Sequence, residues 1–328
     1  MKREIVAAAV AAALAPAAQA ASETLEEVTI IGSREAARVL PGSGAVVDSE
    51  QIRVEAARDI NQLLKTVPGI YIQEEDGYGL RPNIGIRGAT SERSSKVTLM
   101  EDGVLTAPAP YAAPAAYYFP TMSRMHAIEV LKGAPLLRYG PQTTGGVINM
   151  VSTPIPAANS GRLQMAYGQH GEADLLASYG GQAGAFGYLV ETAQRRSDGY
   201  KDIDRSSADT GYDISDYVLK FGWEGERQSL LFKAQYSEET SDETYLGLTD
   251  ADFSGDEDRR YGLSLIDEMD NDHQGYSLTY RLGLGERVDM TAIGYYNEFS
   301  RDWFKLSGGG DFIEAANAGD AFAQGVLD

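Results

Sequence analysis

The chain is poor in the side chains that carry most enzyme chemistry. It has no cysteine and three histidines, which lie far apart at positions 126, 170 and 273. The absence of cysteine excludes disulfide scaffolds, thiol nucleophiles and cysteine-ligated zinc or iron–sulfur centres. The scattered histidines argue against a histidine metal site or a catalytic triad, and neither a nucleophile elbow nor a phosphate-binding loop is present. We therefore expect no enzyme, no metal centre and no cofactor.

The charged residues are mostly acidic and unevenly placed. The 328 residues include 48 Asp and Glu against 28 Lys and Arg, which argues against a nucleic acid partner. Between positions 198 and 272 there are 21 acidic and 7 basic residues. A calcium site in this stretch is conceivable, but the spacing lacks the glycine of an EF-hand loop, so solvated loop acids are the favoured interpretation. The calcium candidates are Asp198, Asp202, Asp204, Asp209 and Asp213.

The N-terminus predicts export. Lys2 and Arg3 precede an apolar stretch that ends in small residues around Ala20, which is the pattern of a cleaved signal peptide over residues 1–20. Residues 21–44 then have little to bury and are expected to form a flexible tail with one β-prone patch, Val28–Ile31.

Two folded segments are expected after the tail. Residues 45–156 predict a small α+β domain, in which Asp59 caps a helix carrying Ile60, Leu63, Leu64 and Val67 on one face. From residue 157 onward, runs of about ten residues alternate apolar and polar side chains, as Tyr217 to Glu224 do. Aromatic strand ends, with short turns alternating with long polar loops, favour a transmembrane β-barrel in the outer-membrane lipid over a secreted β-sandwich.

The α+β segment resembles the plug domain of TonB-dependent outer-membrane receptors. Six short motifs carry the resemblance in this order: Val67-Pro68-Gly69-Ile70, Ile86-Arg87-Gly88, Glu101-Asp102-Gly103-Val104, Ile128-Glu129-Val130-Leu131-Lys132-Gly133, Leu137-Arg138-Tyr139-Gly140 and Gly145-Gly146-Val147-Ile148-Asn149. The fold class implied is an N-terminal α+β plug domain followed by the first strands of a large antiparallel transmembrane β-barrel. Arg138 to Gln142, residues 243–253 and Arg301 to Leu306 look like the ferric-dicitrate receptor subgroup.

The resemblance also implies functional residues. A TonB box, the segment that pairs as an added strand with the periplasmic energy-transducing protein TonB, falls on Glu26, Glu27, Val28, Thr29, Ile30 and Ile31. The alternative is an ordinary first strand of the plug. Thr90, Arg93 and Tyr111 are the expected ligand-facing residues of the outward apex, and Arg87, Glu129, Lys132 and Arg138 are expected to meet the barrel wall or to be simply solvated.

The length of the chain limits how much of a barrel it can form. A barrel wide enough for a plug needs about 22 strands, whereas the 172 residues after position 156 are enough for about seven. We expect an N-terminal fragment of an outer-membrane receptor for energy-coupled uptake of a ferric chelate. The expected ligand is ferric citrate or a related iron–siderophore complex. The acidic loops leave open a different metal complex, and a passive binding or adhesion barrel is the competing class.

Overall fold

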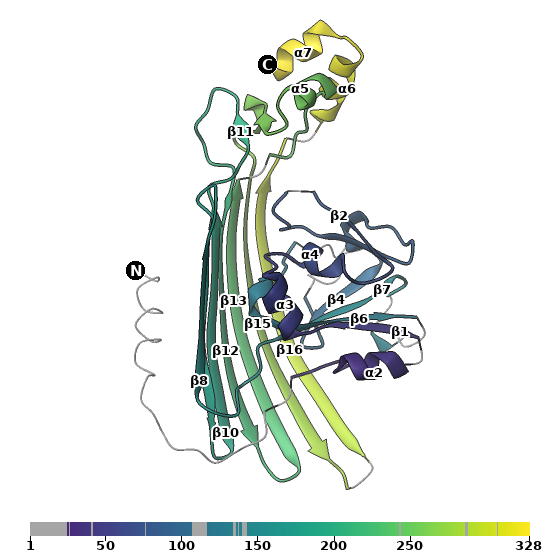
Figure 1. Ribbon diagram of the computed structural model, residues 1–328, viewed down its shortest axis with the longest axis vertical. Coiled ribbons are helices and arrows are strands. Elements are labelled where there is room, and N and C mark those ends of the chain that lie inside the picture. The colour runs from purple at the N-terminus through teal and green to yellow at the C-terminus, as the bar shows by residue number, and fades with distance from the viewer. Residues whose placement is uncertain are drawn as a thin grey trace.

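The computed structural model describes residues 25, 27–40, 42–75, 77–106, 117–133, 136, 138–139, 143–242, 244–285, 288–306 and 308–328. The predicted signal peptide lies outside them. Two parts are visible in Figure 1: a small domain of short strands and helices, and a tall sheet of long strands that curves around one side of it.

The small domain is built on a five-stranded sheet in the order β1-β6-β7-β4-β5. Strands β4 and β7 are parallel, and the other neighbours are antiparallel. A separate hairpin pairs β2 with β3. The bounds are α2 (Arg34–Val39), β1 (Ser43–Val47), α3 (Ser49–Glu55), α4 (Ile60–Leu64), β2 (Ile70–Gln73), β3 (Asn83–Ile86), η1 (Glu92–Ser94), β4 (Val97–Glu101), β5 (Val104–Leu105), η2 (Met122–Arg124), β6 (Met125–Lys132) and β7 (Gly146–Ser152).

Helix α4 forms where the apolar spacing predicted it. The Asp59 carboxylate accepts a hydrogen bond from the Gln62 backbone N–H at 3.1 Å, which satisfies one of the free donors of the first turn. Ile60, Leu63 and Leu64 are fully buried, and they pack in the same core as the sheet residues Ile84, Val97 and Ile128. One apolar core therefore joins the helices to the sheet and fixes the small domain.

Seven long antiparallel strands form the second sheet, in the order β16-β15-β13-β12-β10-β9-β8. This confirms the predicted fold class, a plug-like domain followed by about seven barrel strands. The strands are longer than the alternating runs suggested, and neighbouring strands pair in register over most of their length. Their bounds are β8 (Ser160–Tyr167), β9 (Ala173–Ala183), β10 (Phe186–Ser197), β12 (Tyr212–Glu224), β13 (Gln228–Asp242), β15 (Glu268–Gly283) and β16 (Asp289–Phe304).

The two faces of the long sheet differ as the period of two predicted. On β12, Asp216, Val218 and Lys220 are buried against the small domain, whereas Phe221 on the opposite face is 52% exposed. Tyr236 and Tyr276 are also exposed on neighbouring strands. A polar inner face and an apolar outer face are what a strand needs when it separates lipid from a polar lumen.

The long loops of the sheet gather at one end, where short helices and a two-stranded ribbon pack together (Figure 1). A cluster of Leu246, Tyr261 and Leu327 holds this region. Its elements are β11 (Asp202–Ile203), α5 (Asp250–Gly255), β14 (Arg259–Arg260), η4 (Gly262–Ser264), α6 (Gly310–Asn317) and α7 (Ala321–Leu327). In the described part of the chain, none of the helices is both long and apolar enough for a membrane span.

Candidate functional site

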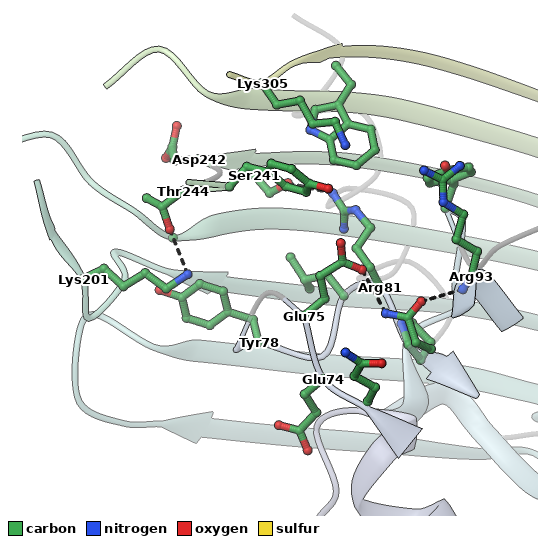
Figure 2. Close-up of a pocket in the computed structure, with 18 of the residues that line it drawn as sticks. Glu74, Glu75, Tyr78, Arg81, Arg93, Lys201, Ser241, Asp242, Thr244 and Lys305 are labelled. Carbon is green, nitrogen blue, oxygen red and sulfur yellow. Dashed lines mark hydrogen bonds between the residues drawn. The ribbon is translucent and has the colours of Figure 1, made fainter. Parts of the chain in front are cut away.

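A pocket of about 500 Å³ lies where the small domain meets the long-loop end of the sheet (Figure 2). The small domain contributes the β2–β3 connection and η1, and the sheet contributes the ends of β13 and β16 with their loops. Its volume falls within the range of small-molecule sites. The lining includes the side chains of Glu75, Tyr78, Arg93, Tyr117, Trp303 and Lys305.

One wall of the pocket combines cations with aromatic rings. The Lys305 ammonium lies 3.8 Å from the ring centroid of Tyr245 and 3.9 Å from that of Trp303. Arg301, which does not line the pocket, lies 4.0 Å over the ring of Tyr117, which comes from the small domain. Among the described residues the buried Trp303 Nε1 has no hydrogen-bond acceptor. This wall therefore offers the positive charge of Lys305 to a ligand that carries oxygen atoms.

The opposite wall is held by hydrogen bonds within the small domain and to the sheet. The Asn83 side chain accepts from the Arg93 backbone N–H at 2.9 Å and donates to Glu75 at 2.9 Å. The Tyr78 hydroxyl donates to the Thr210 carbonyl at 2.9 Å, and burial raises the pKa of Tyr78 to about 12, so it remains neutral. These bonds fix the wall before any ligand arrives, which lowers the ordering cost of binding.

The three predicted ligand-facing residues have different positions. Arg93 lines the pocket, whereas Thr90 is exposed on the same loop and does not line it. Tyr111 lies outside the described residues. The alternation Arg301, Trp303, Lys305 was the missed signal, because a period of two places all three on one face of β16 and of its continuation.

The predicted TonB box is docked between the small domain and the sheet, and its described residues are not in a strand. Glu27 is buried and forms an ion pair of 2.7 Å with Lys220 of β12. The backbone N–H groups of Ile30, Ile31 and Gly32 all donate to the Glu129 carboxylate. Glu26 lies outside the described residues. We call the described residues Glu27–Gly32 the docked tail.

A buried charge network joins the small domain to the sheet. Arg124 is 1% exposed and binds Glu101 at 2.6 Å and Asp216 of β12 at 3.0 Å. Lys233 of β13 binds Glu101 at 2.5 Å and Asp102 at 2.6 Å. Burial disfavours the charged form of Glu101, but the positive charges of Arg124 and Lys233 outweigh that effect and hold its pKa well below its usual range. Glu101 therefore remains ionised at neutral pH.

The network contains none of the four residues that were predicted to meet the barrel wall or to be solvated. Glu129 binds the docked tail, and the Lys132 ammonium donates to the Pro68 carbonyl at 2.7 Å, so both act within the N-terminal part of the chain. Arg87 is exposed, and Arg138 lies 5.7 Å over the ring of Tyr139; neither forms an ion pair with another described residue. The strand faces explain the difference, because the side chains that meet the long sheet lie at the end of β4 and in η2.

One of the calcium candidates, Asp204, is held in an ion pair with a loop arginine. Asp204 and Asp252 both bind the Arg259 guanidinium, at 2.9 and 2.7 Å. A carboxylate engaged in this way is neutralised by a protein cation.

Release of the docked tail is expected to depend on pH through Glu27. Burial raises the pKa of Glu27 to about 7 against the attraction of Lys220, whereas a solvated carboxyl titrates near 4.5. The docked form therefore binds the proton more tightly, so docking is strongest below pH 4.5 and weakens as the pH rises through 7. Protease cleavage of the tail should become about tenfold faster or more between about pH 5 and about pH 8. The Glu27→Gln variant should show a flat profile; a slope that persists in it would assign the effect to another group.

Comparison with known proteins follows the same division of the chain. Residues 36–147 match the family model described as TonB-dependent Receptor Plug Domain. The chain is 26% identical over 228 residues to the vitamin B12 transporter BtuB of Vibrio vulnificus, which covers 68% of this chain and 34% of the transporter. It is 24% identical over 250 residues to BtuB of Photobacterium profundum, covering 74% of this chain and 40% of that protein.

Solved structures share the fold. The ferric citrate transporter FecA in its unliganded form aligns with a TM-score of 0.74 and 23% identity over 88% of this chain and 44% of that one. The ferric yersiniabactin receptor FyuA of Yersinia pestis aligns with a TM-score of 0.67 and 19% identity, over 83% and 43%. The chain thus spans between a third and a half of these relatives. The family-model match lies within residues 36–147, and the solved structures, at 23% and 19% identity, show a shared fold.

Proposed function

We propose that this chain forms the plug and the first barrel strands of an outer-membrane receptor that takes up a ferric chelate, with energy supplied through TonB. The observation that carries the proposal is the placement of two features. The pocket lies at the end of the sheet where Ser241 of β13 and Trp303 of β16 are neighbours of Met269, and the docked tail contacts Arg281 near the other end of β15. The small domain is thus in contact with both the pocket and the docked tail.

The pocket chemistry supports a chelate with exposed oxygen atoms. Lys305 supplies positive charge, and the acidic stretch of the outer loops is partly neutralised by its own cations, as at Arg259. The pocket lining as a whole balances four cations, Arg81, Arg93, Lys201 and Lys305, against four carboxylates, Glu74, Glu75, Glu92 and Asp242. The pocket therefore lacks the excess negative charge of the loop stretch, and the charge near an anionic ligand, rather than the total charge of the chain, governs its attraction. Ferric citrate is the first ligand to test.

A second candidate is a corrinoid, because the curated relatives are named vitamin B12 transporters. The large aromatic side chains of the pocket, Tyr117, Tyr245 and Trp303, would also contact a large ring system. The two candidates differ in charge, so they respond differently to the loss of Lys305.

Cells that express the full gene and lack other routes for both nutrients should take up radiolabelled ferric citrate, and Lys305→Gln should weaken its binding roughly tenfold. Lys96→Gln is the matched control, because Lys96 is exposed on the small domain away from the pocket lining. Uptake of cyanocobalamin with no uptake of iron would replace the ferric chelate by the corrinoid. Uptake of neither would reject both ligands.

A further inference from the structure

Three successive backbone N–H groups of the docked tail are bound to one carboxylate, that of Glu129. Ile30 donates to Glu129 Oε2 at 2.7 Å, and Ile31 and Gly32 donate to Glu129 Oε1 at 3.0 and 2.6 Å. Ile30 and Ile31 lie in a bend, and three successive N–H groups converge on one carboxylate, whereas in a strand alternate N–H groups point to opposite edges. This bent conformation therefore keeps the three donors from pairing with an added strand.

The carbonyl groups of the tail are engaged as well. Asn149 of β7 donates to the Val28 carbonyl at 3.2 Å, and Arg281 of β15 donates to the Glu27 carbonyl at 3.1 Å. Ile30 and Ile31 also pack against Met100, Leu131 and Val147. The small domain thus holds residues 28–32, and the long sheet holds Glu27.

From this geometry we propose that Glu129 is the positioning residue that keeps the tail unavailable to its partner, because it occupies the N–H groups that strand addition requires. The inference rests on the proposed function, in which a partner strand pairs with this segment. A partner that adds a strand gains affinity from main-chain hydrogen bonds, so a carboxylate already bound to those donors competes with it directly.

The surroundings of Glu129 make this competition strong. The side chain is 1% exposed, and β6 places it opposite Asn149 in the sheet, whose amide donates to Glu129 Oε2 at 2.9 Å. Three of its four described donors come from the tail. When the tail leaves, a buried carboxylate loses most of its hydrogen bonds, which favours the return of the tail.

The test measures tail release without the partner. These 328 residues contain no cysteine, so Ile30→Cys provides the one thiol of this part of the receptor, and any cysteine elsewhere in the receptor is replaced by serine. The rate of reaction of this thiol with a maleimide reports how often the tail opens. In this background Glu129→Gln keeps the size of the side chain but turns one oxygen into an amide donor that faces the Ile30 N–H and the Asn149 amide. We expect labelling of the purified full-length receptor to become about tenfold faster.

Two controls keep the result interpretable. Glu50→Gln makes the same change on the exposed face of α3 and should leave the labelling rate unchanged. If Glu129→Gln fails to fold, Ile31→Pro combined with Ile30→Cys replaces it as the test. This variant removes one donor from the tail and leaves the small domain intact, so it should also speed labelling. Unchanged labelling in a folded Glu129→Gln receptor would overturn the inference.

A second arm separates this inference from the proposed function. In cells without added ferric citrate, crosslinking of Ile30→Cys to a cysteine in the partner should increase with Glu129→Gln. If no variant crosslinks, with or without ferric citrate, the proposed function fails, while the labelling rate still decides whether Glu129 holds the tail. Crosslinking that occurs but is equal in both variants would count against Glu129.

Discussion

Deleting residues 21–31 is expected to reduce uptake to background while leaving ligand affinity within about twofold of the wild type. The physical reason is the separation of the two sites: the tail contacts Glu129, Lys220 and Arg281, and none of these three lines the pocket. In the proposed function, uptake uses the tail for strand pairing, whereas binding uses the pocket walls. The measurement is radiolabelled ferric citrate bound to cells at low temperature against the amount accumulated on warming.

A matched pair of point variants guards against a defect in export. Ile30→Pro removes the N–H that a partner strand would use, whereas Ile30→Val keeps it and differs little in shape. The first should lose uptake and the second should retain it, at equal amounts of receptor in the outer membrane. Loss of ligand binding in the deletion variant would contradict this division of labour.

Replacing Arg124 by methionine is expected to destabilise the docking of the small domain against the sheet by about 3–5 kcal/mol. Arg124 binds Glu101, Asp216 and the Tyr118 hydroxyl, and all four groups are buried. Methionine fills much of the volume but leaves two carboxylates with one fewer cation. The loss of stability is measured as the shift in the denaturation midpoint of the receptor in detergent. Protease cleavage of the small domain is the readout.

The variant has an internal control and a rescue. Arg53→Met should cause no measurable change, because its pair with Glu50 is exposed on one helix. Adding Glu101→Gln and Asp216→Asn to Arg124→Met removes the uncompensated charges and should restore part of the stability. A triple variant no more stable than the single one would show that shape, rather than charge, made Arg124 important.

Local patterns in the sequence predicted the elements well. Asp59 and the spacing of Ile60, Leu63 and Leu64 identified α4, because a helix cap and its buried face lie within one short segment. The alternation around Lys220 and Phe221 identified a strand with two unlike faces for the same reason. Each of these signals depends only on neighbours in the chain.

The partners across the interface could not be predicted in this way. Glu129 lies 97 to 99 residues from the donors it binds, and Lys220 lies 193 residues from Glu27. Which of several charges meets which depends on the height of each strand in the sheet and on where the tail docks. A period of two shows that Lys220 and Lys233 face inward, but it does not show that Lys233 meets Glu101 and Asp102.

The most direct test of an energy-coupled receptor is the accumulation of radiolabelled ferric citrate by cells before and after a protonophore collapses the proton gradient. If the docked tail serves energy transfer, accumulation should fall to the level of surface binding after the protonophore, and that binding should persist. Accumulation that continues unchanged without the gradient would contradict the account and indicate a passive barrel.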